Sequence, residues 1–460
     1  MHEDRLKNLN AKPISTNGDY VLYWMQQSQR AHYNHALEYA ISLANSINVG
    51  VVVCLGITEK YPEANLRHFG FMLQGLSETQ SFLHERGIKF VIKKGSPPEI
   101  ALNYARRAAA VVCDRGYLKH QRQWRRYLGK KAKQQVTQVE GDSIVPVEQV
   151  SDTREFAART IRPKIHKLVD IYLQDLCLRK SKKNTLNLEI EGGLNVRNPE
   201  QVLSNLSVAD DVKPSQRICG GTSVARKKLQ YFILSQLQGY ANSRNDPASP
   251  QCSELSPYLH FGQISPIEIA LKVKSSKSGS SQDKEAFLEE LLIRRELAIN
   301  FVFFEKDYDR YSALPDWAKK TLHEHRNDTR PYRYTRKQME NGETHDEAWN
   351  AAMREMRETG YMHNYMRMYW GKKILEWTNT PKYGYATALY LNNKYFIDGR
   401  DPSSYSNIAW IFGLHDRPWK EREVFGKVRY MNEKGLRRKF DITAYIDRVD
   451  RLVENKKTDQ

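Results

Sequence analysis

An uninterrupted apolar run at Val49–Leu55 constrains the fold of this chain more than any other feature. A strand that is apolar at every position must be covered on both faces, as the central strands of parallel sheets are. The flanking segments Ala31–Ile47 and Leu66–His84 carry apolar residues at helical spacing. Strand and helix patterns therefore alternate, which predicts a parallel, doubly wound sheet.

The same alternation predicts an α/β domain over residues 18–148. Further strands are expected at Tyr20–Trp24, Lys89–Ile92 and Ala110–Cys113, and a helix at Pro97–Ala108 has proline near its start. Sheets of this kind bind ligands beyond the carboxyl ends of their strands. The chain has neither GxGxxG nor GxxxxGK[ST], so the sequence does not support classical dinucleotide or P-loop phosphate chemistry.

Residues 149–221 are predicted to form a connector, and residues 222–455 a helical domain. Within the connector, Ser181–Ser215 is polar and aperiodic, which indicates a long loop with short helices. Beyond it, helical patterns are clearest at Val224–Tyr240 and Tyr361–Trp377. Ala286–Glu305 is apolar on most sides and is expected to be a central buried helix. Its charged residues then need partners: Glu289, Glu290, Arg294, Arg295 and Glu296.

The net charge points to a polyanionic partner. The 460 residues carry a formal charge of +18, and the pI is about 9.4. This balance fits nucleic acid or a charged membrane surface, and nucleic acid is the simpler choice. One basic run, Lys119–Lys133, is better explained as a solvated helix face, although it could contact DNA directly.

The sequence shows no membrane span, secretory signal or metal motif. No apolar run is long enough to cross a bilayer, and the N-terminus lacks an apolar signal core. Five cysteines without a CxxC pair fit reduced thiols rather than disulfides or a zinc site. His323-Glu324-His325 is not HExxH, and its histidines would point to different sides of a helix. We expect no metal and a cytoplasmic location, on the nucleoid in a prokaryote, with the nucleus also open.

Residues 362–410 combine aromatic and polar side chains. Trp370 and Trp377 lie seven residues apart and therefore on one helix face. The polar residues beside them rarely enter a core: Asn364, Arg367, Asn392, Asp398, Arg400 and Asp401. The combination suits a pocket for a large, flat, polar cofactor, although composition alone favours a helical core whose charges pair with one another.

Several motifs in this region and elsewhere resemble those of the photolyase/cryptochrome family. MHNYMRM (Met362–Met368), SPYLHFGQIS (Ser256–Ser265) and DGRDP (Asp398–Pro402) resemble its flavin domain. The resemblance to class II cyclobutane pyrimidine dimer photolyases rests on RNDP (Arg244–Pro247), HDRPW (His415–Trp419) and KVRYM (Lys427–Met431). It covers the chain from Tyr20 to about Ile446, with the motifs in family order.

The resemblance implies an α/β domain followed by an all-α domain that binds FAD. The residues that match the FAD site are Tyr240, Ser253, Leu255, Ser256, Asn364, Arg367, Asn392, Asp398 and Arg400. A cation such as Arg367 favours an anionic, reduced flavin, and Asp398 would pair with it. Asn392 matches the class II asparagine facing flavin N5, although a helix C-cap or turn explains it without the family. Ser256-Pro257 is equally an ordinary helix start.

The implied reaction is light-driven electron transfer from reduced FAD to a pyrimidine dimer flipped out of UV-damaged DNA, and hence a carbon–carbon lyase. Glu290 matches a carboxylate that hydrogen-bonds the dimer, and if protonated it could steady the dimer radical anion, which would need a pKa raised by burial. The residues that match other dimer or DNA contacts are Arg244, Asn245, Met368, Trp410, Arg417 and Arg429. Each could instead be an ordinary phosphate contact or surface residue. Arg294 stands where some class II enzymes have a second stacking tryptophan.

Trp370 and Trp349 match the class II chain that reduces oxidised flavin, while Trp377 and Tyr334 are more simply packing residues. We expect a monomer, and an antenna chromophore in the α/β domain could be a deazaflavin, a folate or absent. One alternative is a cryptochrome-like FAD photoreceptor without repair activity, which the matched dimer residues and the lack of a long tail disfavour. Another is a light-independent nucleotide-binding module, which the FAD-like helical half disfavours.

Overall fold

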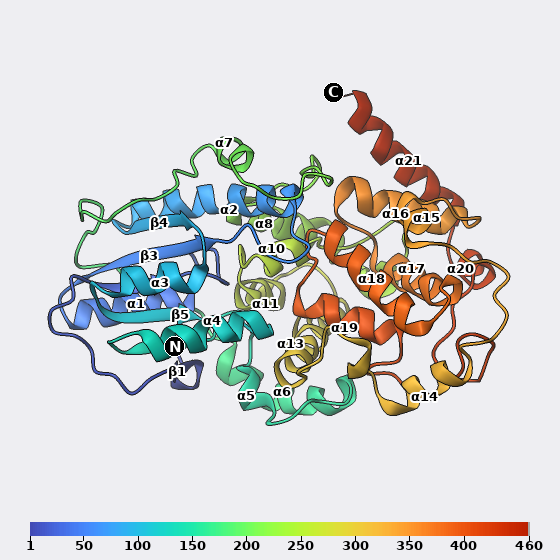
Figure 1. Ribbon diagram of the computed structural model, residues 1–460, viewed down its shortest axis with the longest axis horizontal. Helices are drawn as coiled ribbons and strands as arrows, with labels where there is room; N and C mark the ends of the chain where they lie inside the picture. Colours follow the sequence, from blue (N-terminus) through green and yellow to red (C-terminus); the bar gives the residue numbers. More distant parts are fainter. Residues whose placement is uncertain (459–460) are drawn as a thin grey trace.

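The computed structural model describes residues 1–458 and has an α/β half followed along the chain by a helical half (Figure 1). The strands are β1 (Leu6–Asn8), β2 (Tyr20–Trp24), β3 (Gly50–Ile57), β4 (Lys89–Lys94), β5 (Ala108–Asp114) and β6 (Val136–Val139). They form one sheet in the order β1-β6-β5-β2-β3-β4. All neighbours are parallel except β1 and β6, which are antiparallel. β1 and β6 were not predicted, and the three residues of β1 carry no pattern.

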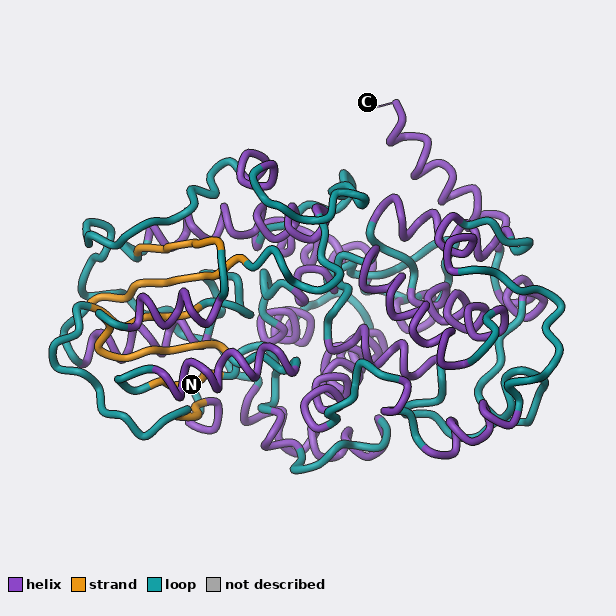
Figure 2. The backbone as a smooth tube through the Cα atoms, viewed as in Figure 1, coloured by secondary structure: helices purple, strands orange, loops and turns teal. Residues whose placement is uncertain are grey.

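Helices cover both faces of the sheet (Figure 2). The helices of this half are α1 (His35–Ser46), α2 (Leu66–Glu85), α3 (Pro97–Ala105) and α4 (Lys119–Lys131). Val51 and Val53 face the core layer that contains residues of α1 and α2, whereas Val52 and Cys54 face the layer of α3 and α4. Every residue of β3 is buried. The predicted doubly wound sheet is therefore confirmed.

The basic run at the start of α4 is only partly a solvated face. Most of its lysines and arginines are exposed, but Arg125 is buried. Its Nη2 lies 2.7 Å from Oδ1 of Asp114 at the end of β5. One arginine of the run therefore holds the helix against the sheet.

The connector contains α5 (Val147–Val150), α6 (Ala158–Tyr172) and α7 (Pro199–Ser204). Residues 173–221 have α7 as their only helix, and they run along the α/β half, where Thr185 Oγ1 donates to the carbonyl of Val51 at 2.7 Å. The predicted long loop with short helices is confirmed.

The helical half is built from many short and medium helices. They are α8 (Thr222–Tyr231), η2 (Phe232–Gln236), α9 (Tyr240–Ser243), α10 (Ser256–His260), α11 (Pro266–Ser275), α12 (Ser281–Leu288), η3 (Glu289–Arg294), α13 (Arg295–Phe304), η4 (Tyr311–Ala313), α14 (Asp316–Glu324), α15 (Arg336–Asn341), α16 (Glu347–Thr359), α17 (Asn364–Trp377), α18 (Pro381–Tyr395), α19 (Pro402–Ile411), α20 (Glu433–Lys439) and α21 (Ile442–Thr458). η2 and η3 are π-helical. The single helix expected at Val224–Tyr240 is divided, because α8 continues into η2 but ends before Tyr240, where α9 begins. The central helix expected at Ala286–Glu305 exists, with a π-helical turn inside it.

Arg67 of α2 joins the two halves. It is buried, and its guanidinium donates to the carbonyls of Met356 and Tyr395 at 3.2 and 2.9 Å, and to that of Arg357 at 2.5 Å. The carbonyls of Arg357 and Tyr395 lie at the ends of α16 and α18, where helical partners are missing, whereas that of Met356 also accepts the N–H of Gly360 at 2.9 Å. One side chain from the α/β half therefore satisfies acceptors of the helical half.

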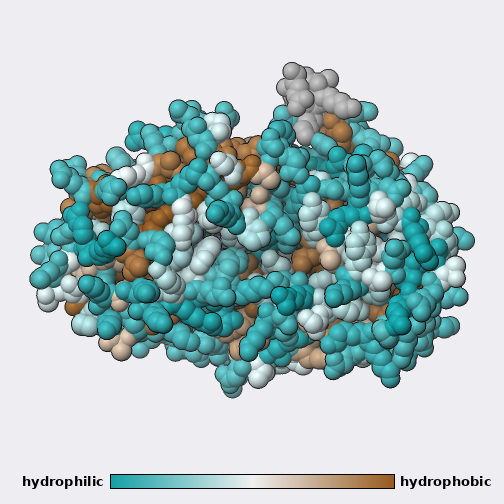
Figure 3. Space-filling view, viewed as in Figure 1, coloured by the Kyte–Doolittle hydropathy of each residue, from teal (hydrophilic) through white to brown (hydrophobic). Residues whose placement is uncertain are grey.

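The face seen in Figure 3 is mostly hydrophilic, with small apolar patches over the α/β half. No helix among the described residues is long and apolar enough to cross a membrane.

Candidate functional site

The helical half contains an open cavity of about 620 Å³, walled by residues of α10, η3, α17, α18 and α19. The predicted site residues that line it are Tyr240, Arg244, Asn245, Ser253, Leu255, Ser256, Glu290, Arg294, Asn364, Arg367, Met368, Trp370, Asn392, Trp410 and Arg429. The predicted residues outside this lining are Trp349, Asp398, Arg400 and Arg417. Segments separated by almost two hundred residues thus meet in one enclosure.

Arg367 is held in place on the cavity wall by one carboxylate. Its Nη2 lies 3.2 Å from Oδ1 of Asp398, and its Nε donates to the carbonyl of Met362 at 3.1 Å. The guanidinium also lies 3.7 Å from the centre of the Phe396 ring. The expected pairing of Arg367 with Asp398 is confirmed, and it explains why Asp398 lies behind the wall.

Two acidic residues fix the polar turns on the other side of the cavity. Asp283 accepts the backbone N–H groups of Gly239 and Ala241 at 3.2 and 2.9 Å, and these bonds lower its pKa to about 2. They orient the turn that presents Tyr240. Glu254, with a positive φ of 50°, contacts Lys228 at 2.9 Å in the turn between Ser253 and Leu255. Sequence reasoning missed both supporting carboxylates.

The π-helical turn η3 directs charged residues toward the cavity. Oε1 of Glu290 accepts a hydrogen bond from Nη2 of Arg244 at 2.8 Å. The side chain of Glu290 is 38% exposed. Glu289 lies outside the lining and pairs with Arg162 and Arg294 at 2.7 and 3.2 Å. The charges of this helix therefore have partners, as expected.

Opposite η3, the cavity has a rim of aromatic and basic side chains. Trp410 is partly buried on α19, and the guanidinium of Arg429 lies 5.4 Å from its ring centre. Arg429 also pairs with Asp416 at 3.3 Å and lies 4.4 Å from the ring of Trp419. Arg417 is exposed beside Trp419, at 5.6 Å from that ring, and therefore belongs to the rim rather than the interior.

Aromatic side chains connect the cavity to the surface. Trp370 lines the cavity, and its backbone carbonyl accepts the indole N–H of Trp349 at 3.0 Å. Trp349 and Trp377 have ring centres 5.3 Å apart, as do Trp377 and Tyr334. The hydroxyl of Tyr334 lies 2.8 Å from Nδ1 of His345. The two tryptophans predicted for the electron path, Trp370 and Trp349, thus lie in hydrogen-bond contact, and Trp377 and Tyr334, predicted as packing residues, extend the aromatic cluster.

Some lining residues were missed although the sequence held a signal for them. Ser403, Ser406 and Asn407 of α19 face the cavity together with Trp410. Their spacing of three, four and seven residues from Ser403 places them on one helix face. Asp401 caps this helix by accepting the N–H of Ser403 at 2.8 Å. His415 and Asp416 were also missed, because their motif had been assigned to Arg417.

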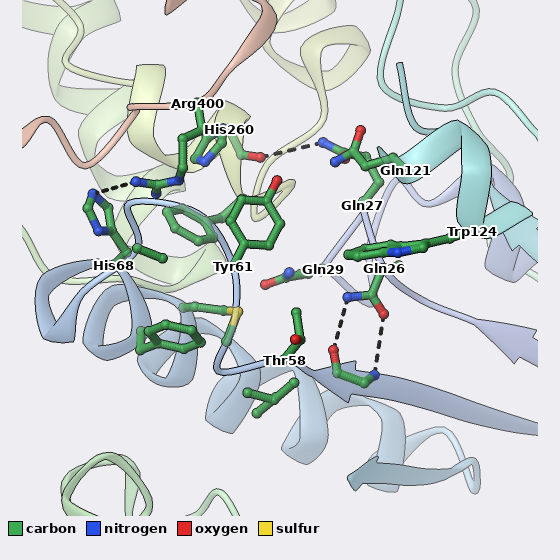
Figure 4. Close-up of a pocket in the computed structure, with 16 residues that line it drawn as sticks. Gln26, Gln27, Gln29, Thr58, Tyr61, His68, Gln121, Trp124, His260 and Arg400 are labelled. Carbon is green, nitrogen blue, oxygen red and sulfur yellow. Dashed lines mark hydrogen bonds between the residues drawn. The ribbon is translucent and has the colours of Figure 1, made fainter. Parts of the chain in front are cut away.

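A second, smaller cavity of about 90 Å³ lies where the two halves meet (Figure 4). Gln26 and Gln27 follow β2, and Thr58 follows β3, so the cavity opens at the carboxyl ends of these strands. The direction in which successive strands are added to the sheet changes at β2, and doubly wound sheets bind ligands at such a position. The side chain of Gln26 donates to and accepts from the backbone of Gly56 at 3.0 and 3.3 Å.

Arg400 faces this second cavity and not the first. It occupies a turn with φ of 67°, and its Nη1 donates to the carbonyl of Asn393 at 2.7 Å. Burial, together with this guanidinium, keeps the pKa of His68 well below its ordinary value. This backbone turn leaves no pattern in the sequence. It directs Arg400 away from the larger cavity, where its motif predicts it.

The composition of the larger cavity fits FAD. The arginines of its lining are Arg244, Arg294, Arg295, Arg367 and Arg429, against the two carboxylates Glu290 and Asp416. This excess of positive charge suits an anionic ligand. The indole Nε1 of Trp370 is buried and has no hydrogen-bond partner among the described residues, and Asn364, Asn392 and the lining serines supply neutral polar contacts. No group of three or more potential metal ligands occurs in the described part of the chain.

Comparison with known proteins agrees with the fold and the cavity. The DNA photolyase family model matches residues 21–181. A deoxyribodipyrimidine photo-lyase of Methanothermobacter thermautotrophicus is 46% identical over 454 residues, covering 99% of this chain and all of that protein. A class III photolyase structure from Agrobacterium tumefaciens has 19% identity and a TM-score of 0.72, covering 94% and 86% of the two chains. An archaeal photolyase structure from Sulfolobus tokodaii has 16% identity and a TM-score of 0.67, with coverage of 93% and 89%.

The fold defines a photolyase-type architecture. The chain belongs to the DNA photolyase family, and it is an enzyme of the lyase class.

Proposed function

We propose that this protein repairs cyclobutane pyrimidine dimers in DNA under light, as a class II photolyase with reduced FAD in the larger cavity. One observation carries the proposal: the residues matched to FAD and those matched to the dimer line a single cavity. Residues matched to FAD, such as Arg367 and Asn392, and residues matched to the dimer, such as Met368 and Trp410, line the same cavity.

The charged groups of the cavity have distinct roles in this proposal. When bound and reduced, FAD supplies the electron that splits the dimer under illumination. Arg367, fixed by Asp398, places a positive charge where an anionic ring would lie. The Arg244–Glu290 pair holds hydrogen-bonding groups on the dimer side. Trp410 offers an aromatic surface for a flipped base, and the guanidinium of Arg294 provides a planar surface in place of a second tryptophan.

DNA is the proposed macromolecular partner. The charge of +18 attracts phosphates, and Arg417 and Arg429 lie on the rim beside Trp419. A damaged pair leaves the duplex at low cost, which contributes to selectivity. We further propose that the enzyme acts as a monomer in the compartment that contains the DNA.

The second cavity is the proposed place for an antenna chromophore. It adjoins the helical half through His260 and Arg400. The Sulfolobus tokodaii structure is described as holding two FAD molecules, with the implication of a novel light-harvesting cofactor. In this chain the cavity is lined by glutamine amides and by the aromatic side chains of Tyr61 and Trp124, which suits a planar polar ring.

Irradiated oligothymidine provides the direct test. Full-length protein with chemically reduced FAD should restore the absorbance at 260 nm under blue light and leave it unchanged in the dark. The variant Trp410→Ala should retain FAD yet lose discrimination between dimer-containing and undamaged DNA. Photoreduction of FAD without any repair would refute the proposal and favour the cryptochrome-like alternative.

A further inference from the structure

Lys372 is completely buried in the middle of α17, and no carboxylate lies within ion-pair distance of it in the described part of the chain. Lysine is seldom fully buried without such a partner, because removing an ammonium group from water is costly. Its Nζ donates to the carbonyl of Ile411 at 2.5 Å. Ile411 is the last residue of α19, so this carbonyl has no helical donor and lies at the negative end of the helix dipole.

A glycine favours this burial. A Cβ on Gly371 would lie 2.1 Å from Cδ1 of Ile411, so a side chain at position 371 would displace the Ile411 side chain from its place between α17 and the end of α19. The close approach places the adjacent Lys372 under α19. Lys372 is therefore part of the contact between α17 and α19.

The ammonium also contacts the aromatic ring that faces the cavity. Nζ of Lys372 lies 5.5 Å from the ring centre of Trp410, a distance at which a cation is attracted to an indole face. Trp410 itself lines the cavity, whereas Lys372 does not. Lys372 can thus act on a bound ligand only through Trp410 and α19.

We infer that Lys372 is a positioning residue that fixes the Trp410 indole for stacking on a flipped pyrimidine dimer, and that its charge state makes dimer recognition depend on pH. The inference rests on the proposed function, because it takes Trp410 to be the stacking surface. A neutral amine still donates to Ile411, but it no longer attracts the indole.

The charge of Lys372 changes within the physiological range. Burial lowers its pKa to about 7, Asp416 opposes this shift and Arg429 adds to it. Both of these residues belong to the loop after α19, and they are the charged groups that act on Lys372 among the described residues. The ammonium form dominates below pH 7, so recognition should weaken as the pH rises above this value.

The neighbouring Lys373 is a matched control. It belongs to the same helix and is also mostly buried, but its Nζ pairs with Glu376 at 2.9 Å and lies near Trp377 instead of Trp410. Lys373→Met removes the same charge from α17 without touching the proposed contact.

Anisotropy of a labelled oligonucleotide carrying one thymine dimer, and of its undamaged copy, tests the inference in the dark. The full-length, FAD-loaded protein is titrated from pH 6.0 to 8.5 at constant ionic strength. Wild-type discrimination should fall several-fold across this range. Lys372→Met should lower discrimination about tenfold at pH 6.0 and abolish the pH response, while Lys373→Met should behave as wild type.

Combination with Trp410→Ala separates positioning from general destabilisation. Lys372→Met should add nothing in the Trp410→Ala background. Trp410→Phe keeps a stacking ring but attracts a cation less than an indole does, so it should keep part of the discrimination and show a smaller pH response. This result decides the matter even if Lys372→Met does not fold. Wild-type discrimination and pH response in Lys372→Met, or a wild-type pH response in Trp410→Phe, would overturn the inference. A wild-type protein that never distinguishes the dimer would instead refute the proposed function.

Discussion

Replacing Glu296 with glutamine should remove a pH dependence of stability that this single carboxyl group imposes. Glu296 is buried on α13, and its Oε1 accepts the backbone N–H groups of Ile144 and Val145 at 2.6 and 3.2 Å. Burial raises its pKa to about 8, although the two N–H groups act in the opposite direction. The glutamine carbonyl oxygen can accept the same two bonds, so the substitution removes the titration and keeps the contact.

The sign of the effect follows from proton binding in the two states. Between pH 4.5 and pH 8, folded Glu296 keeps a proton that the unfolded chain has lost. Raising the pH therefore favours unfolding, by about 1.4 kcal/mol for each pH unit. The stabilisation is complete below pH 4.5 and falls as the pH rises toward 8, where folded Glu296 is half ionised, so the step from pH 6 to pH 8 should cost about 2.3 kcal/mol.

Urea unfolding at pH 6, 7 and 8, followed by tryptophan fluorescence, measures this difference. Glu296→Gln should gain stability relative to wild type with each step in pH. Glu155→Gln is a matched control: burial opposes the shift, but the hydrogen bond from Lys164 lowers the pKa of Glu155, so its carboxylate stays ionised in both states above pH 6. Its difference from wild type should not vary over this range. Parallel pH dependences for wild type and Glu296→Gln would refute the reasoning.

Further perturbations have equally definite outcomes. Arg67→Met leaves the carbonyls of Arg357 and Tyr395 without their donor at the boundary between the halves and should lower the free energy of unfolding by about 3 kcal/mol; a loss under 1 kcal/mol in chemical denaturation would contradict this. Gly371→Ala normally stabilises a helix, but the clash with Ile411 should destabilise the protein by about 1–3 kcal/mol and lower its melting temperature. Trp370→Phe should slow photoreduction of oxidised FAD and spare repair by chemically reduced enzyme, and an unchanged photoreduction rate would remove it from the path. Affinity for DNA should fall steeply as salt rises, and a flat titration would exclude a phosphate-dominated interface.

Local pattern predicted four of the six strands, the helices between them and a helical second half, but not the individual exceptions. β3 and its neighbouring helices were predictable because a strand buried on both faces and an amphipathic helix each leave a periodic record in the sequence. β1 left no such record, because its three residues form an edge strand through their pairing with β6 and not through a pattern of their own. The π-helical turn of η3 was equally invisible, although it is what turns Glu290 toward Arg244.

The sequence by itself determined the alternating sheet, the helical half, the basic charge and, through its motifs, the residues of a flavin site. Tertiary structure alone decided which of these residues share a cavity, and it turned Arg400 toward a different one. Lys372 and Lys373 are adjacent and identical in the chain, yet one is buried beneath an indole and the other is paired with Glu376. The reason is physical: the cost of burying a charge and the contacts that compensate it depend on distances between distant segments, and no local pattern records those distances.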